Sequence, residues 1–253
     1  TGALDFSDNE FLLHGFESTS TTYTPNSSND ATQSGSFSTG GTGIVDNAWD
    51  FGGGKITTSH QFLPTSGDWT YSTWVNFDNI GGASNEILRS STYPQQFEIW
   101  RNSAGLNIAQ SGTDTFEAQS NLANGVWYNI VLVHSTSGDA TYLNGVAKTT
   151  STFTTVPTDT TWYLGGRANN SEPLDGQMDQ TTVWDRALTS SEVSSLYSSP
   201  ATLPSGLLSY YDFEDTGSTL SNYDVIITEP NTKLLGLNDV TFSVGATSAS
   251  VNT

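Results

Sequence analysis

The sequence predicts an all-β fold, an antiparallel sandwich or jelly roll with one short helix near residues 189–197. Three observations support this prediction. Short runs rich in β-branched and aromatic residues recur along the chain. Gly, Asn, Asp, Ser and Pro separate these runs at spacings typical of sandwiches and jelly rolls. Only one segment has the pattern of a helix.

The strands follow one another through most of the chain. An Asn-Gly pair in "YLNGV" stands between β-forming residues, and this predicts a tight hairpin around Asn144 and Gly145. The expected strands are 71–77, 85–91, 96–102, 105–110, 126–135, 140–148, 161–167 and 178–186.

The predicted helix is "LTSSEVSSLY", residues 188–197. Thr189 is the expected N-cap, and Glu192 three residues later completes a capping box. Leu188 and Val193 are spaced as a hydrophobic staple. A helix of about two turns is not stable alone, so it needs a sheet to pack against.

Composition excludes several classes of function. The chain has 253 residues, enough for one large β-domain or one domain plus a fragment of another. Its 26 acidic and 7 basic residues give a net charge of −19, which argues against nucleic acid and anionic membranes as partners. The absence of cysteine excludes disulfides and zinc–thiolate sites. No apolar run is long enough for a transmembrane helix, so we expect no membrane insertion.

Two segments resemble each other and indicate an internal repeat. Residues 9–30 and 206–225 each contain an apolar strand, a Phe-Glu pair and a polar loop. The pairs are Phe16-Glu17 and Phe213-Glu214. A Ser/Pro/Gly linker at 198–206 precedes the second copy, which is cut short at residue 253. The alternative is that two β-strands with polar loops simply look alike.

Four blocks in order resemble one known family. They are "GIVDNAWDFGGGKI" (43–56), "DWTYSTWVNF" (68–77), "NGVWYNIVLVHSTSGDATYLNGV" (124–146) and "LDGQMDQTTVWDRALTSSEVSSLY" (174–197). Residues 44–197 resemble the laminin-G-like modules of the concanavalin A-like lectin/glucanase superfamily. The resemblance implies a two-sheet antiparallel jelly roll. We expect this domain over residues 1–200, with 201–253 as linker plus a partial second repeat or terminal strands.

The resemblance also implies a structural calcium ion. Members of the family often hold calcium where the closing signature meets the first loop, and hard cations prefer several oxygen ligands. Asp179 is expected in a loop before the last strand. Pro25 or Asn26 stands where the family usually has an aspartate, so Asp179 could instead cap a loop. The implied ligands are Asp179, Glu17, Asn26, Asn29 and Asp30.

A glycan-binding face is the second expectation. In "QFEIWRN" the alternation of a strand places Phe97 and Ile99 on one face, and Glu98 and Trp100 on the other. Aromatic rings stack on sugars while polar side chains bind their hydroxyls. The alternative is that a loop covers Trp100. The family pattern adds Tyr93, Gln95, Arg167, Asn169 and Asn170 from loops nearby.

Catalytic motifs are missing from the sequence. Glucanases of this superfamily carry Glu-x-Asp-x-x-Glu or a close variant on one strand, and no such run occurs here. The three histidines, His14, His60 and His134, lie far apart and lack metal or triad spacing. We therefore expect no enzymatic activity.

These observations predict an acidic, extracellular, non-catalytic module that binds a glycan or polysaccharide, with calcium in a structural role. The first residue is Thr, which favours excision from a longer protein that is secreted or displayed on a cell or virion. The alternative is a structural spacer of a surface adhesin, surface layer or viral fibre, which contacts neighbouring repeats or other proteins. An enzyme is a third, less favoured alternative.

Overall fold

The computed structural model divides the chain into two compact units. The larger unit contains residues 26–223, and the smaller contains residues 1–25 and 224–253. The structure describes residues 21–25, 31–82, 84–91, 97–102, 105–110, 113–119, 122–148, 156–215, 219–220, 223–227, 239–244 and 247–252.

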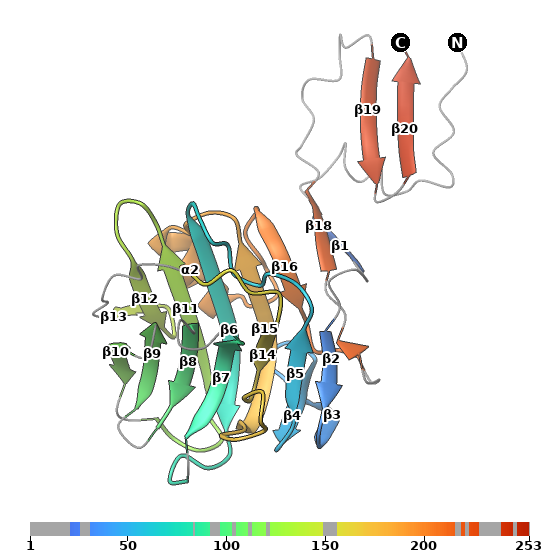
Figure 1. Cartoon of the computed structure of the whole chain (residues 1–253). Helices are drawn as coiled ribbons and strands as arrows, with labels where there is room; N and C mark the ends of the chain where they lie inside the picture. Colours follow the sequence, from blue (N-terminus) through green and yellow to red (C-terminus); the bar gives the residue numbers. More distant parts are fainter. Residues whose placement is uncertain are drawn as a thin grey trace. The chain divides into compact units, whose positions relative to one another are not determined.

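Two antiparallel sheets form the larger unit (Figure 1). The first sheet has the spatial order β10 (Thr113–Gln119), β9 (Leu106–Gln110), β8 (Phe97–Arg101), β7 (Asn85–Ser90), β14 (Trp162–Leu164), β5 (Lys55–Thr58), β2 (Ala31–Ser34) and β17 (Thr219–Leu220). The second has the order β13 (Val146–Lys148), β12 (Ala140–Leu143), β11 (Trp127–His134), β6 (Trp69–Phe77), β15 (Asp175–Trp184), β4 (Asn47–Gly52) and β3 (Phe37–Thr42), with β16 (Leu207–Tyr211) paired to β15. The predicted fold class, a jelly-roll sandwich with one short helix, is confirmed.

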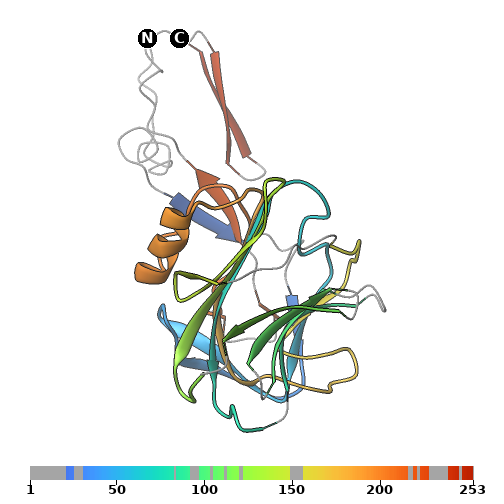
Figure 2. The same cartoon turned by 90° about the vertical axis from the view of Figure 1, so that its left-hand side faces the viewer.

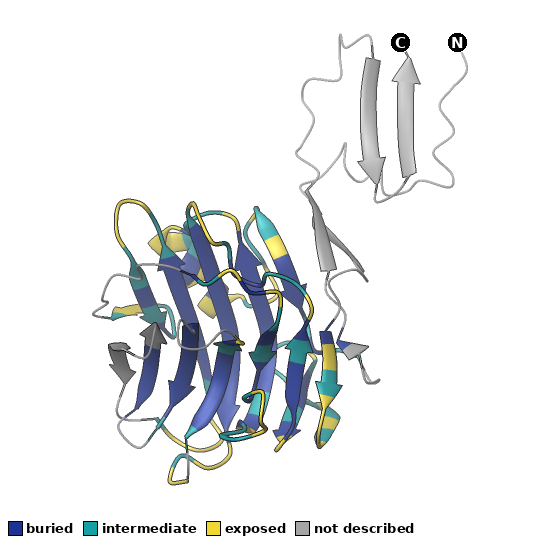
Figure 3. Ribbon diagram, in the orientation of Figure 1, coloured by how far each residue is buried: buried dark blue, intermediate teal, exposed yellow. Residues whose placement is uncertain are grey.

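Residues alternate between the core and the outer face of each sheet. In β6, Trp69, Tyr71 and Phe77 belong to the main hydrophobic cluster, whereas Thr70 and Trp74 point away from it. Figure 3 shows buried residues along the central strands of both sheets.

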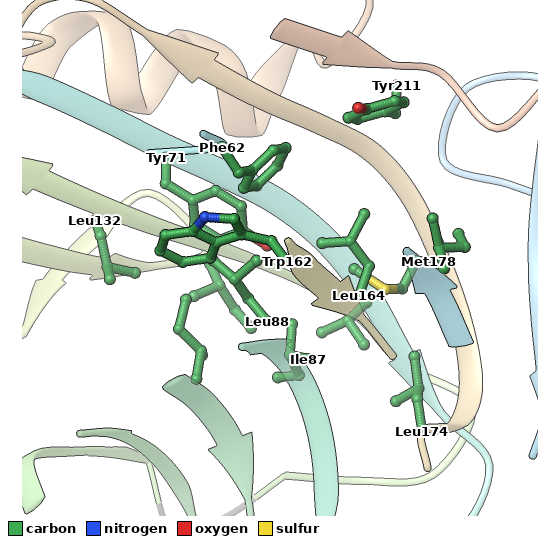
Figure 4. Packing of buried hydrophobic residues seen from close by; sticks show 14 of the residues in the cluster. Phe62, Tyr71, Ile87, Leu88, Leu132, Trp162, Leu164, Leu174, Met178 and Tyr211 are labelled. Atoms are coloured by element: carbon green, nitrogen blue, oxygen red, sulfur yellow. The ribbon is translucent and has the colours of Figure 1, made fainter. Parts of the chain in front are cut away.

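The main core fills the space between the sheets. In Figure 4, Leu88, Trp162 and Leu164 of the first sheet lie near Tyr71 and Met178 of the second. All five side chains are fully buried. This aromatic and aliphatic packing supplies most of the apolar surface that folding removes from water.

Helix α2 (Ser190–Ser198) covers part of the outer face of the second sheet (Figure 2). The capping box is present, because Thr189 and Glu192 exchange hydrogen bonds as predicted. Val193 packs with Leu188 and with Trp184 of β15 in a second hydrophobic cluster. The helix is therefore held by a local capping signal together with contacts to the sheet.

The predicted Asn-Gly hairpin connects β12 and β13. Asn144 and Gly145 have positive φ angles of 53° and 72°, as a tight hairpin turn requires. Asparagine and glycine adopt these angles at low cost.

The two outermost segments of the chain contribute further strands. In the smaller unit, β19 (Asp239–Val244) pairs with β20 (Thr247–Asn252), and β1 (Thr21–Pro25) pairs with β18 (Tyr223–Ile227), whose first residue falls in the larger unit. Within residues 201–253, the strands β16 and β17 belong to the sandwich, since they pair with β15 and β2. Among the described residues, no helix is long and apolar enough to cross a membrane.

Candidate functional site

Strand β8 presents two of the predicted ligand-binding residues on the outer face of the first sheet. Phe97 and Ile99 lie in the core, and Glu98 and Trp100 lie on the opposite face, as the alternation predicts. Trp100 pairs with Glu86 of β7 in the register of the sheet. Only 9% of Trp100 is exposed, so little of its ring can contact a ligand.

A network of arginines and glutamates lies on the same face. Arg89 pairs with Glu98 through its Nη1 atom, and the same atom lies 3.6 Å from Glu86 Oε2. Arg167 donates from Nε to Glu86 Oε2 at 2.6 Å, and its Nη2 lies 2.9 Å from Glu172 Oε2 and 3.6 Å from Glu98 Oε2. Two guanidinium groups therefore share three carboxylates.

Burial controls the charge state at the centre of this network. The Glu86 side chain is fully buried, and burial raises its pKa to about 8 although Arg167 acts in the opposite direction. Its Oε1 atom has no hydrogen-bond partner among the described residues. Glu86 thus needs Arg167 to keep its charge inside the protein.

The 165–174 loop, which connects β14 to β15, brings Arg167 to the sheet. The backbone N–H of Glu86 donates to the Glu172 carbonyl at 2.9 Å, which holds one arm of the loop against β7. Lys55 donates to the Ala168 carbonyl at 2.8 Å and to Asn170 Oδ1 at 2.6 Å, which holds its tip. Hydrogen bonds and ion pairs to neighbouring strands therefore position the loop.

A hollow of about 320 Å³ lies between this loop and strands β7 and β14. Its walls offer guanidinium and amide N–H groups, hydroxyl groups and one aromatic ring, Tyr163. Its lining consists of Arg89, Ser90, Ser91, Tyr163, Arg167, Ala168, Asn169 and Ser171.

Asp179 lies within strand β15, as the expected strand over 178–186 indicates, and the separate expectation of a loop at this residue was wrong. The strand is irregular between Asp179 and Thr182, and Gln180 has a positive φ of 48°. With this irregularity the strand continues through Asp179, where a loop was expected. Asp179 Oδ2 accepts hydrogen bonds from the N–H groups of Ile44 and Val45, at 2.8 and 3.0 Å.

The other oxygen of Asp179, Oδ1, is buried and has no partner among the described residues. Burial raises the pKa of Asp179 to about 7, and the nearby carboxylate of Glu214 adds to this. Glu214 accepts from the N–H and Nδ2 groups of Asn47, at 2.9 and 2.6 Å. An orphaned buried oxygen beside a second carboxylate suits a hard cation.

The fold and these sites are consistent with one known family. Residues 50–194 match the concanavalin A-like lectin/glucanases superfamily, over more than half of the chain. The chain belongs to this superfamily. The predicted resemblance is therefore confirmed, and no curated protein sequence matches closely enough to indicate a relative.

Solved structures share the fold of this concanavalin A-like domain at low identity. A candidate carbohydrate binding protein from Bacteroides ovatus is 19% identical with a TM-score of 0.54, and the match covers 78% of this chain. This chain spans only 60% of the Bacteroides protein. Domain 4 of AbnA, an extracellular arabinanase from Geobacillus stearothermophilus solved with arabinotriose, is 19% identical with a TM-score of 0.54. That match covers 66% of this chain and 87% of the arabinanase domain.

The structure brings together some of the residues predicted to bind ligand in the concanavalin A-like domain. Arg167 and Asn169 line the hollow, and Glu98 belongs to the ion network beside it. Asn170 instead binds Lys55. Tyr93 and Gln95 lie outside the described residues.

Other residues of the hollow and of the ion network beside it were missed by sequence reasoning. Glu86 and Arg89 flank the apolar pair Ile87-Leu88 in β7, and charged residues beside such a pair in a strand were a usable signal. Glu172 was considered only as a catalytic acid, and Tyr163 only as a strand residue. Nothing local in the sequence indicates that these residues meet.

Four of the five predicted calcium ligands, Glu17, Asn26, Asn29 and Asp30, lie outside the described residues. Among the residues that the structure does describe, no group of three His, Cys, Asp or Glu side chains is close enough to hold a metal. Glu214 near Asp179 was missed, although the repeat had already paired Phe213-Glu214 with Phe16-Glu17.

Proposed function

We propose that this concanavalin A-like domain is a non-catalytic carbohydrate-binding module of a secreted or surface-displayed protein. The observation that carries the proposal is the hollow beside the 165–174 loop, whose lining combines hydrogen-bonding groups with the Tyr163 ring. The likeness in fold to a candidate carbohydrate binding protein and to an arabinanase domain solved with arabinotriose supports it.

The chemistry of the lining suits a sugar. Sugar hydroxyls need both donors and acceptors: the Asn169 side-chain amide can donate, and the Ser91 hydroxyl oxygen, whose proton goes to Asp159, can accept. The C–H-rich face of a sugar ring packs favourably on an aromatic ring such as Tyr163. The walls are already ordered by ion pairs and backbone hydrogen bonds, so binding would cost little conformational entropy.

Retention on immobilised polysaccharide tests this proposal. We expect Tyr163→Ala and Asn169→Ala to weaken retention on affinity gels, while Trp127→Ala, a half-buried aromatic on the outer face of the other sheet, leaves it unchanged. A stacked aromatic is worth about 2 kcal/mol in a binding hot spot, so Tyr163→Ala should reduce affinity roughly 30-fold. The site would be contradicted if Tyr163→Ala and Asn169→Ala were retained as strongly as Trp127→Ala on every polysaccharide gel that retains the unaltered chain.

The role of Trp100 requires a separate comparison. If Trp100 stacks on sugar, Trp100→Ala weakens retention. Only 9% of Trp100 is exposed, and this favours a structural role for it. The same observation supports the alternative that the domain is a spacer module. Unchanged retention with a lowered melting temperature would remove Trp100 from the proposed site. Loss of retention at an unchanged melting temperature would contradict the structural role.

Burial of the carboxylates in the network argues against hydrolysis. Glycoside hydrolysis needs two carboxyl groups that reach the scissile bond from either side. Glu86 and Glu98 both point at the same arginines, and both side chains are largely buried. We expect no turnover of laminarin, lichenan or alginate; turnover that Glu86→Gln or Glu98→Gln abolishes would contradict the proposal.

We also propose a structural calcium ion at Asp179. The residue fits because its Oδ1 atom is buried and unpartnered and because Glu214 supplies a second carboxylate nearby. Glu17, Asn26, Asn29 and Asp30 remain the proposed further ligands. The ion would neutralise these carboxylates and so hold the 43–46 loop, which already contacts Asp179, against β15.

Calcium should therefore raise the melting temperature above that in chelator. Binding to the folded state alone stabilises by about 2.7 kcal/mol when free calcium is 100 times Kd. Asp179→Asn, which keeps an acceptor for Ile44 and Val45, should abolish the difference. The exposed Asp175→Asn, in the same strand, should preserve it. Identical midpoints of the unaltered chain in calcium and in chelator would contradict the site.

A further inference from the structure

Both arginines that line the hollow are already paired with carboxylates. Arg89 and Arg167 are its only cationic lining residues among those the structure describes, and Glu86, Glu98 and Glu172 surround them. A guanidinium group has five N–H donors, so each arginine keeps donors beyond those its carboxylates accept. The hollow thus offers hydrogen-bond donors on guanidinium groups that are each already paired with a carboxylate.

Glu172 is the most accessible of the three carboxylates. Its side chain is 33% exposed, compared with 0% for Glu86 and 9% for Glu98. It lies 2.9 Å from Arg167 Nη2, on the arm of the loop that pairs with β7. Glu172 is not part of the lining itself, but its carboxylate already takes an N–H group of Arg167, which is.

We infer that Glu172 makes the hollow selective for uncharged sugars, because its carboxylate occupies Arg167 and keeps out the carboxylate of an acidic sugar. This inference rests on the proposed carbohydrate-binding function and names the class of glycan. A neutral sugar can accept hydrogen bonds from the remaining N–H groups. A uronic acid would compete with Glu172 for Arg167 and would also be repelled by a chain of net charge −19.

The test compares neutral and acidic glycans on one array, followed by titration with polygalacturonate and its methyl ester, which differ in charge. We expect the unaltered chain to bind neutral glycans and no acidic ones. Glu172→Gln should keep neutral binding within about twofold and bind acidic glycans about tenfold more tightly or better, the gain from one charge-assisted hydrogen bond. This gain should decline with added salt.

Asp175→Asn is the matched control, because it removes one negative charge at the same end of β15 from an exposed residue. It should leave acidic glycans unbound. Retained neutral binding by Glu172→Gln shows that the variant is folded; if it is not folded, Glu172→Ser is compared in its place.

Two outcomes would overturn the inference while leaving carbohydrate binding intact. One is an unaltered chain that binds acidic glycans as well as neutral ones. The other is a folded Glu172 variant that gains no acidic binding, or gains no more than Asp175→Asn. If the unaltered chain bound no glycan at all, the proposed function would fail and this inference with it.

Discussion

Trp184→Ala is expected to lower the free energy of unfolding by about 3–5 kcal/mol, as truncation of a buried aromatic side chain does. Trp184 is fully buried and packs with Leu188 and Val193, and its Nε1 group donates to the Pro204 carbonyl at 3.0 Å. The change would leave a cavity between β15 and α2 and also an unpaired carbonyl. Denaturant titration measures the loss.

Two further tryptophans calibrate this result. Trp74 is 5% exposed and stacks on Tyr197, with ring centroids 5.6 Å apart. Trp74→Ala should therefore also destabilise the domain severely, although less than Trp184→Ala because Tyr197 is itself exposed. Trp127→Ala, at a half-buried position, should lower the free energy of unfolding least of the three. If Trp184→Ala and Trp127→Ala had the same denaturant midpoint, this would contradict the burial of Trp184 between β15 and α2.

Arg167→Met is expected to lower the free energy of unfolding by about 3 kcal/mol at pH 9, since it removes the hydrogen-bonded partner of Glu86 in the protein interior and leaves Arg89 3.6 Å away. Methionine keeps much of the side-chain volume without the charge. Arg186→Met is the matched control: Arg186 pairs with Glu192 where both side chains are about one third exposed, and such a pair contributes about 1 kcal/mol or less.

The loss in Arg167→Met should depend on pH. The folded-state pKa of Glu86 is about 8, above its ordinary value of 4.5, so the folded protein binds this proton more tightly than the unfolded chain does. This group therefore makes stability fall as pH rises from about 4.5 to 8. At pH 5 Glu86 carries the proton and needs Arg167 less, so the loss should be smaller there than at pH 9.

Urea titrations of both variants at pH 5 and pH 9 measure this dependence. In the double variant Glu86→Gln with Arg167→Met, the pH dependence of the loss should disappear, because the fully buried carboxylate that hydrogen-bonds Arg167 is gone. A loss that is equal at both pH values in Arg167→Met would show that Glu86 is not the group left uncompensated.

Elements specified by neighbouring residues could be predicted from the sequence. The capping box joins Thr189 to Glu192 three positions away, and the Asn144-Gly145 hairpin needs only two adjacent residues. The alternation in β8 likewise placed Phe97 in the core and Glu98 on the outer face. In each case the determinant is backbone geometry over a few residues, which the local sequence encodes.

The candidate sites depended instead on residues far apart in the chain. Arg167 and Glu86 are 81 positions apart and meet because β14 lies beside β7 in the first sheet. Glu214 reaches Asn47, 167 positions away, because β16 pairs with β15. The sequence indicated a repeat whose two copies contain Glu17 and Glu214. The repeat pattern does not indicate which of these two glutamates lies near Asp179.

By itself, the sequence determined the all-β class, the family, the short helix and the face on which each described residue of β8 lies. Tertiary structure alone decided strand order and register, and with them the grouping of three glutamates around two arginines and the burial of Trp100. The physical reason is that side-chain alternation is a property of one strand. Electrostatic partners and solvent exposure depend on which other strands and loops lie beside it.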